Sequence, residues 1–200
     1  RRHLVDKVFP RGAISGTTCS VLVPISEKSS VGLINLNAIF KSLNYGRNDM
    51  QILKIQAGPY AFKAKLEVEQ APKTCARFLE LLPFRNKTIH SRWSGEAVWV
   101  PLGDFDAKLD FENQTCHPSR GDILFYPGGV SETEILFAYG SSSFASKMGE
   151  LAGNHFLTVV EGQENLFDFG HLVLWEGAQN IEFIVSLFLS TEKISLCQVF

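Results

Sequence analysis

The stretch YAFKAKLEVEQAPKTCARF, residues 60–78, holds the clearest local pattern in this chain of 200 residues. Its first half alternates Lys or Glu with a set of apolar residues: Phe62, Ala64, Leu66 and Val68. This period of two is typical of a β-strand with one face in water. In the second half, Pro72 suits a first helical turn, and Cys75 and Phe78 share one helical face. The stretch therefore predicts a strand that leads directly into an amphipathic helix, which Pro83 ends.

Short runs typical of β-strands follow this helix, at 88–93, 97–102, 123–126, 134–139, 155–160, 171–175 and 181–189. Turn residues separate them, for example Pro127-Gly128-Gly129 and Gly153-Asn154. Short strands in this number, with only one strong helix, favour a closed barrel or a sandwich over alternating βαβ units. Closure would also remove the unpaired edges of the sheet. We therefore expect a mainly β fold.

The chain divides into three parts by its patterns. Residues 1–49 form an N-terminal extension of uncertain structure, with a short strand predicted at 17–25 and a ragged amphipathic helix at 31–43. Three interpretations of the segment 31–43 are open: it packs against the rest of the protein, it is disordered, or it is an amphipathic helix that binds a partner. Residues 50–186 form the β domain, and residues 187–200 form a C-terminal extension.

Composition excludes several classes of partner. The net charge is -2 and no run of Lys or Arg occurs, which argues against a nucleic-acid partner. The longest apolar stretch, 181–189, contains Glu182 and Ser186 and is shorter than the ~20 residues that span a bilayer. It predicts a buried strand, so we expect no membrane partner.

The four cysteines, Cys19, Cys75, Cys116 and Cys197, lack the spacing of a zinc site or a disulfide framework. Adjacent strand residues face opposite ways, so Cys116-His117 also predicts poor metal geometry. We therefore expect no metal and no cofactor. Reduced thiols, together with the lack of a leader segment after Arg1, favour a cytoplasmic location.

Several longer motifs carry a resemblance to known proteins. APKTCARF (71–78) resembles the start of the first cyclophilin helix, and LAGNHF (151–156) with VVEG (159–162) resembles a later cyclophilin stretch. More closely, IHSRWSGEAVWVPL (89–102), GDILFYPGGVSETEILFAYG (121–140) and FASKMGELAGNHF (144–156) look like a family of uncharacterised, mostly bacterial proteins with a cyclophilin-like fold. The resemblance implies a closed cyclophilin-like β-barrel with one or two short helices.

The resemblance also bears on prolyl isomerisation, whose barrier of ~18–20 kcal/mol comes from amide resonance. It implies that Arg92 matches the arginine that hydrogen-bonds the prolyl nitrogen, and that His155 matches the cyclophilin histidine. The positions of a cyclophilin phenylalanine, glutamine and pocket tryptophan hold Ala97, Val100 and Glu150 instead. Because catalysis needs the whole constellation, efficient isomerase activity is not predicted, and whether the chain is an enzyme stays open. A degenerate isomerase or a binder of proline peptides remains an alternative.

Polar and aromatic residues concentrate in the longer motifs, besides His90: Arg92, Trp93, Glu96, Trp99, Tyr126, Glu132, Glu134, Tyr139 and His155. If the fold places them around one concavity, an arginine flanked by aromatic rings would bind a small polar or carboxylate-bearing ligand. Glu132 and Glu134 share a strand face, so one could have a raised pKa and accept a proton. We therefore predict a ligand pocket near Arg92.

Other interpretations of the same residues are open. Arg92 could instead pair with Glu96 or Glu134, Trp93 and Trp99 could pack at the barrel rim, and His155 could be a hydrogen-bonded turn residue. A third function is a structural one, in which the aromatic patch is the interface of a homo-oligomer. The partners expected are therefore a small molecule, a short peptide or a second copy of the chain.

Overall fold

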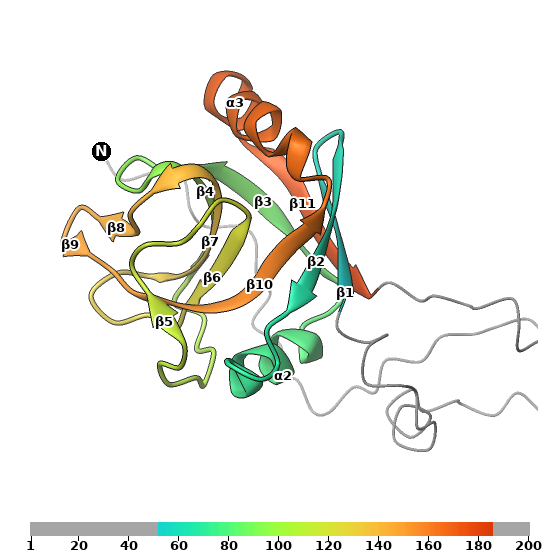
Figure 1. The fold of residues 1–200 in the computed structure, drawn as a ribbon. Helices are drawn as coiled ribbons and strands as arrows, with labels where there is room; N and C mark the ends of the chain where they lie inside the picture. Colours follow the sequence, from blue (N-terminus) through green and yellow to red (C-terminus); the bar gives the residue numbers. More distant parts are fainter. Residues whose placement is uncertain (1–51, 186–200) are drawn as a thin grey trace, which may run out of the picture. The chain divides into compact units, whose positions relative to one another are not determined.

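The computed structural model describes residues 52–185. Both predicted extensions lie outside the described residues, with their strand at 17–25 and helix at 31–43, so the boundaries at 50 and 186 stay predictions. Eight antiparallel strands form a ring in the order β2, β1, β11, β3, β4, β7, β6, β10, and the pairing of β10 with β2 closes it (Figure 1). The predicted mainly β, closed barrel is confirmed.

The barrel strands are β1 (Ile52–Ala57), β2 (Tyr60–Leu66), β3 (Phe84–His90), β4 (Gly95–Gly103), β6 (Asp122–Tyr126), β7 (Thr133–Ser142), β10 (Gly153–Glu161) and β11 (Gln179–Val185). A short strand, β5 (Gln114–Thr115), pairs with β10, and β8 (Ala145–Ser146) pairs with β9 (Gly149–Glu150) in a separate hairpin. The helices are α2 (Pro72–Glu80), α3 (Leu166–Glu176) and the 3-10 turn η2 (Gln163–Asn165).

The strand and helix predicted from residues 60–78 are both present, as β2 and α2. Phe62, Ala64 and Leu66 are buried at alternate positions of β2, while Pro72 opens α2. Phe78 of α2 packs edge-on against Phe156 and Phe183, with ring centroids 4.9 and 5.2 Å apart. Figure 1 shows α2 and α3 near opposite ends of the barrel.

One predicted strand, 171–175, is wrong, because these residues belong to α3. Three apolar residues at helical spacing, Leu166, Phe169 and Val173, are buried against the barrel. Others on the same helix are exposed, including Leu174 and Trp175, so residues 172–175 (LVLW) are continuously apolar and hide the helical period. The sequence patterns also do not single out β1, β5, β8 or β9.

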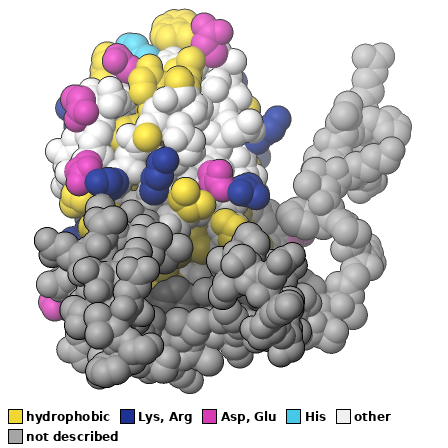
Figure 2. All heavy atoms as spheres, turned by 90° about the vertical axis from the view of Figure 1, so that its right-hand side faces the viewer, with side chains coloured by type: hydrophobic (Ala, Val, Ile, Leu, Met, Phe, Trp, Pro, Cys, Tyr) yellow, Lys and Arg dark blue, Asp and Glu magenta, His cyan; other side chains and the backbone are white. Residues whose placement is uncertain are grey.

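Figure 2 shows apolar side chains at the upper end of the face it displays, and Lys and Arg interspersed with Asp and Glu below them. None of the helices within residues 52–185 has the length and apolar character needed to cross a membrane.

A buried polar network joins α2 to β10 and to the segment before β5. Asn154 Nδ2 donates to Thr74 Oγ1 at 3.0 Å, and Thr74 Oγ1 donates in turn to Glu112 Oε1 at 2.8 Å. The Glu112 backbone N–H donates to Asn154 Oδ1 at 3.0 Å. Thr74 and Asn154 are fully buried, so each needs these partners to offset the loss of water. The two motifs that resemble cyclophilins, around Thr74 and Asn154, therefore meet in space.

We expect Thr74→Val to lower the free energy of unfolding by about 1–3 kcal/mol, because it removes two buried hydrogen bonds without changing side-chain volume. Asn154 Nδ2 then keeps its bond to the Asp110 carbonyl, and Glu112 keeps its bond from the Thr74 backbone N–H. Denaturant titration of the purified variant measures the loss. Thr88→Val is the matched control: Thr88 is equally buried but its hydroxyl makes one bond, to the Trp99 carbonyl at 3.1 Å. Equal losses in the two variants would contradict a special role for the network.

Candidate functional site

A cavity of about 370 Å³ lies on the outer face of the barrel, beside β4 and β7. Residues 89–94 and 144–148 line it, together with Trp99, Ser131 and Glu134. Trp99 alternates along β4 with Val98 and Val100, which are buried in the barrel interior, so its side chain belongs to the outer face. The segment before β4 and the β8–β9 hairpin therefore enclose a site on the outside of the sheet.

Four of the nine predicted site residues line this cavity: Arg92, Trp93, Trp99 and Glu134. Arg92 and Trp93 are exposed in the bend between β3 and β4. Within residues 52–185 no ion pair reaches the Arg92 guanidinium, so the alternative pairings with Glu96 and Glu134 are not made. The guanidinium therefore keeps its hydrogen-bond donors available at the edge of the cavity.

Glu134, on β7, is the buried ionisable group of the cavity. Its side chain is only 6% exposed, and no hydrogen bond or ion pair reaches its carboxyl group from the rest of the described chain. Burial, and secondarily the charge of Glu132, raise the pKa of Glu134 to about 7. The predicted raised pKa of one of these two carboxyl groups is thus present in the structure. Near neutral pH this group can either donate or accept a proton.

Tyr126 lies behind the cavity wall rather than on it. Its ring packs edge-on against Phe144, with centroids 5.8 Å apart, in a small cluster that also contacts Trp99. The Tyr126 hydroxyl accepts a hydrogen bond from the Val130 backbone N–H at 3.2 Å. Tyr126 therefore packs behind Phe144 and Trp99 and does not line the cavity.

Glu96 and Tyr139 line a different and more open depression of about 550 Å³, together with Arg120 and Phe167. Glu96 Oε2 accepts a hydrogen bond from the Ser141 backbone N–H at 2.6 Å. The Tyr139 hydroxyl lies 2.8 Å from His90 Nε2, and His90 itself lines the cavity beside Arg92. The single concavity expected from the sequence is therefore two.

Glu132 and His155 line neither hollow. Glu132 is exposed and accepts a hydrogen bond from the Gly103 backbone N–H at 3.0 Å. His155 Nε2 lies 3.3 Å from Asp122 Oδ1 and 2.9 Å from Thr158 Oγ1, which donates to Glu67. Burial alone would lower the pKa of His155, but the hydrogen bond and charge of Asp122 outweigh it, so the pKa is raised. Its contacts fit the hydrogen-bonded structural histidine that the sequence left open.

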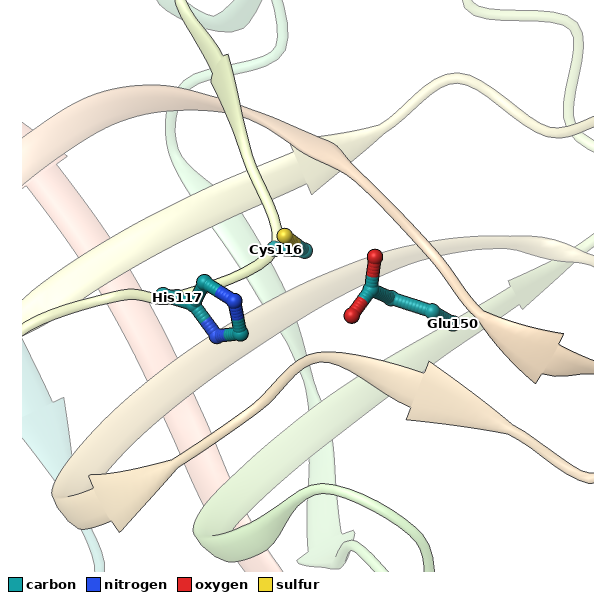
Figure 3. A group of neighbouring side chains, drawn as sticks. All are labelled: Cys116, His117 and Glu150. Atoms are coloured by element: carbon teal, nitrogen blue, oxygen red, sulfur yellow. The ribbon is translucent and has the colours of Figure 1, made fainter.

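The geometric reason given against a metal at Cys116-His117 is wrong. These residues lie in a bend after β5 and not in a strand, so their side chains need not face opposite ways. Figure 3 shows both near the carboxylate of Glu150. The ligand atoms of Cys116, His117 and Glu150 all lie within 4.8 Å of one another. Sequence reasoning missed Glu150, which is 33 or more positions away in the chain and shares no spacing signal with the other two.

We expect Glu134→Gln to stabilise the protein at about pH 8 and to change it little at about pH 4. A carboxyl whose pKa is raised on folding from 4.5 to about 7 destabilises the folded state as pH rises through that window. Above pH 7 the ionised Glu134 lowers the free energy of unfolding by at most about 3 kcal/mol, at 1.36 kcal/mol per pKa unit. Thermal unfolding at the two pH values measures it, with Glu132→Gln as the exposed control. A gain that is equal at both pH values would contradict the raised pKa.

For His155 the expected pH dependence has the opposite sign. Because its pKa is raised on folding, its pairing with Asp122 stabilises the protein fully below the unfolded pKa of about 6.5, and this stability is lost as pH rises through the folded pKa. Asp122→Asn should therefore cost more free energy of unfolding at about pH 5.5 than at about pH 9. Denaturant titrations at both pH values test this, with the exposed Asp168→Asn as control. An equal loss of unfolding free energy at both pH values would show that Asp122 does not raise the pKa of His155.

Comparison with solved structures finds likeness at low sequence identity. The structure of McbB in complex with tryptophan matches with a TM-score of 0.51 and 16% identity over 66% of this chain and 44% of that chain. This chain thus spans less than half of McbB, and the likeness concerns the fold alone. A hypothetical protein from Archaeoglobus fulgidus has a TM-score of 0.47 and 15% identity, over 70% of this chain and 99% of that one. A cyclophilin-type peptidyl-prolyl cis-trans isomerase of Cryptosporidium parvum has a TM-score of 0.45 and 14% identity, over 68% and 99%.

No curated protein matches the chain. A family model described as a protein of unknown function, DUF3830, matches residues 53–185, which are most of the chain and nearly all of its described part. The predicted membership of an uncharacterised family is confirmed. The chain belongs to the DUF3830 family of proteins of unknown function.

Proposed function

We propose that this protein binds a small, carboxylate-bearing ligand in the cavity lined by Arg92 and Glu134. One observation carries the proposal: Glu134 is only 6% exposed, yet it borders the cavity, and no other residue of 52–185 hydrogen-bonds its carboxyl group. Among residues 52–185 the only fully buried side-chain polar atom without a partner is Ser142 Oγ, so the Glu134 oxygens are open to the cavity. Groups of this kind with a strongly shifted pKa cluster at functional sites, where a ligand supplies the missing partner.

The residues around Glu134 indicate the chemistry of the ligand. Arg92 can donate two parallel hydrogen bonds to a carboxylate, and the rings of Trp93 and Trp99 offer apolar surface to a flat or aliphatic body. Glu134, with its pKa near 7, suits a hydroxyl or amine on the same ligand. A volume of about 370 Å³ lies at the small end of the range for small-molecule pockets.

Whether the protein is an enzyme is not part of this proposal. A proline-containing peptide is the second candidate ligand, because Arg92 and Trp99 line the same cavity. Ala97 and Val100, which replace a phenylalanine and a glutamine of cyclophilins, are fully buried and do not line it. Of the apolar pocket that would bind a proline ring, only Trp93 and Trp99 are therefore available in the cavity.

The proposal also covers the cellular location of the protein and its partners. We infer a cytoplasmic location, which the free thiols of Cys75 and Cys116 support. No nucleic acid or membrane is among the partners proposed. Trp93 and Met148, 60% and 69% exposed at the rim of the cavity, also fit contact with a second copy of the chain.

Ligand titrations followed by calorimetry test the proposal. L-tryptophan is a suitable first probe because it has a carboxylate, an amine and a ring, and because the McbB structure contains it. We expect carboxylate ligands to bind more tightly than their amides, and Arg92→Ala to weaken binding by roughly 10-fold to 100-fold, as for a charge-assisted hydrogen bond. Glu134→Gln should remove a change of affinity near pH 7.

Arg120→Ala is the matched control, because Arg120 lines the other depression. Equal weakening by Arg92→Ala and Arg120→Ala, or indifference to both, would refute the site. A protease-coupled assay on a proline peptide separates the second candidate: acceleration that Arg92→Ala abolishes would favour the isomerase alternative. Light scattering on the same samples shows whether a second copy covers the Trp93 rim.

A further inference from the structure

Three side chains outside the cavity form the one group of three potential metal ligands within residues 52–185. They are Cys116, His117 and Glu150, whose sulfur, imidazole nitrogen and carboxylate oxygen lie within 4.8 Å of one another. In Figure 3, Glu150 extends from β9 towards the bend that holds Cys116 and His117. Thiolate, imidazole and carboxylate are the three protein groups that Zn²⁺ binds.

The backbone holds these residues together before any cation binds. The Phe144 backbone N–H donates to the Cys116 carbonyl at 2.6 Å, and the Leu151 N–H donates to the Phe144 carbonyl at 2.9 Å. Ala145 pairs with Glu150 across the β8–β9 hairpin. The bend with Cys116 is thus bonded directly to the segment that carries Glu150.

A second set of bonds fixes the bend itself. The His117 backbone N–H donates to Thr115 Oγ1 at 3.0 Å, and Thr115 pairs with Gly153 of β10. Cys116 is half-buried, whereas His117 and Glu150 are exposed. The site therefore rests on the barrel, while one side of it stays open to water.

The distances suit a tetrahedral cation after a small adjustment. Zinc bonds of about 2.0–2.3 Å place neighbouring ligand atoms roughly 3.3–3.6 Å apart at tetrahedral angles. The present limit of 4.8 Å exceeds this by about 1.2–1.5 Å, which the exposed His117 and Glu150 side chains can supply by rotation. The thiol favours zinc-like transition metals over Mg²⁺ and Ca²⁺, which prefer oxygen ligands.

We propose that Cys116, His117 and Glu150 bind a zinc-like divalent transition-metal cation, with a fourth position open to water or to a ligand. Three protein ligands with one open position are the arrangement of reactive zinc sites, whereas structural sites use four. This site is separate from the cavity of Arg92 and Glu134, and it does not depend on the ligand proposed there.

The test is a titration of the full, metal-stripped chain with Co²⁺, whose bond to a thiolate gives a near-ultraviolet charge-transfer absorption. We expect one equivalent to saturate this absorption and Zn²⁺ to displace it. Cys116→Ser should abolish the absorption, and Glu150→Gln, which keeps the thiol, should weaken binding at least roughly 10-fold, since even indirect metal partners contribute that much. The melting temperature of each metal-free variant confirms that it folds.

Cys19→Ser with Cys197→Ser is the matched control, because it removes two thiols elsewhere in the sequence. This double variant should keep both the absorption and its affinity. The proposal is overturned if no charge-transfer absorption forms, if it persists in Cys116→Ser, or if it disappears in the double control. Unchanged affinity in Glu150→Gln would likewise remove Glu150 from the site and with it the three-ligand proposal.

Discussion

Thr74 and Asn154 lie 80 positions apart in the chain and share a hydrogen bond in the interior. Asn154 belongs to β10, the strand that pairs with β2 on one side and with β6 on the other and so closes the ring. Bonding β10 to α2 at this point holds the closing strand in place. Because Thr74 and Asn154 are fully buried, each depends on these bonds for its partners in place of water.

Closure of the barrel in this register also decides which residues meet on its outer face. Along β7, Glu134 and Leu136 face outward, whereas Ile135, Phe137 and Tyr139 pack in the interior. Glu134 therefore belongs to the cavity of Arg92, and Tyr139 is carried to the other side of the strand. The alternation of side chains alone predicts this separation, since the two residues are an odd number of positions apart.

The cavity and the three metal-ligand candidates share one structural part, the segment 144–151. Residues 144–148 line the cavity, and Glu150 follows at the end of the same hairpin. The segment is the short β8–β9 hairpin with its flanking residues, and backbone bonds of Phe144 to Cys116 and Leu151 hold it in place. Functional groups carried on a short loop and positioned by a rigid barrel are a common arrangement in proteins.

Hydrophobic period and turn chemistry are local properties, and from them the sequence predicted a mainly β fold, a barrel or a sandwich, and the helix after β2. The closed barrel and the motifs around Thr74 and Asn154 came from the resemblance of the sequence to a known family. It also placed Glu134 near Glu132, whose charge adds to the larger effect of burial in raising the pKa of Glu134. Only the tertiary structure decided that 171–175 is helical, that His155 lies away from Arg92, and that Glu150 lies near Cys116 and His117. The order of the strands, their register and the path of the loops decide which distant residues meet. These three properties of the fold leave no periodic signal in the sequence.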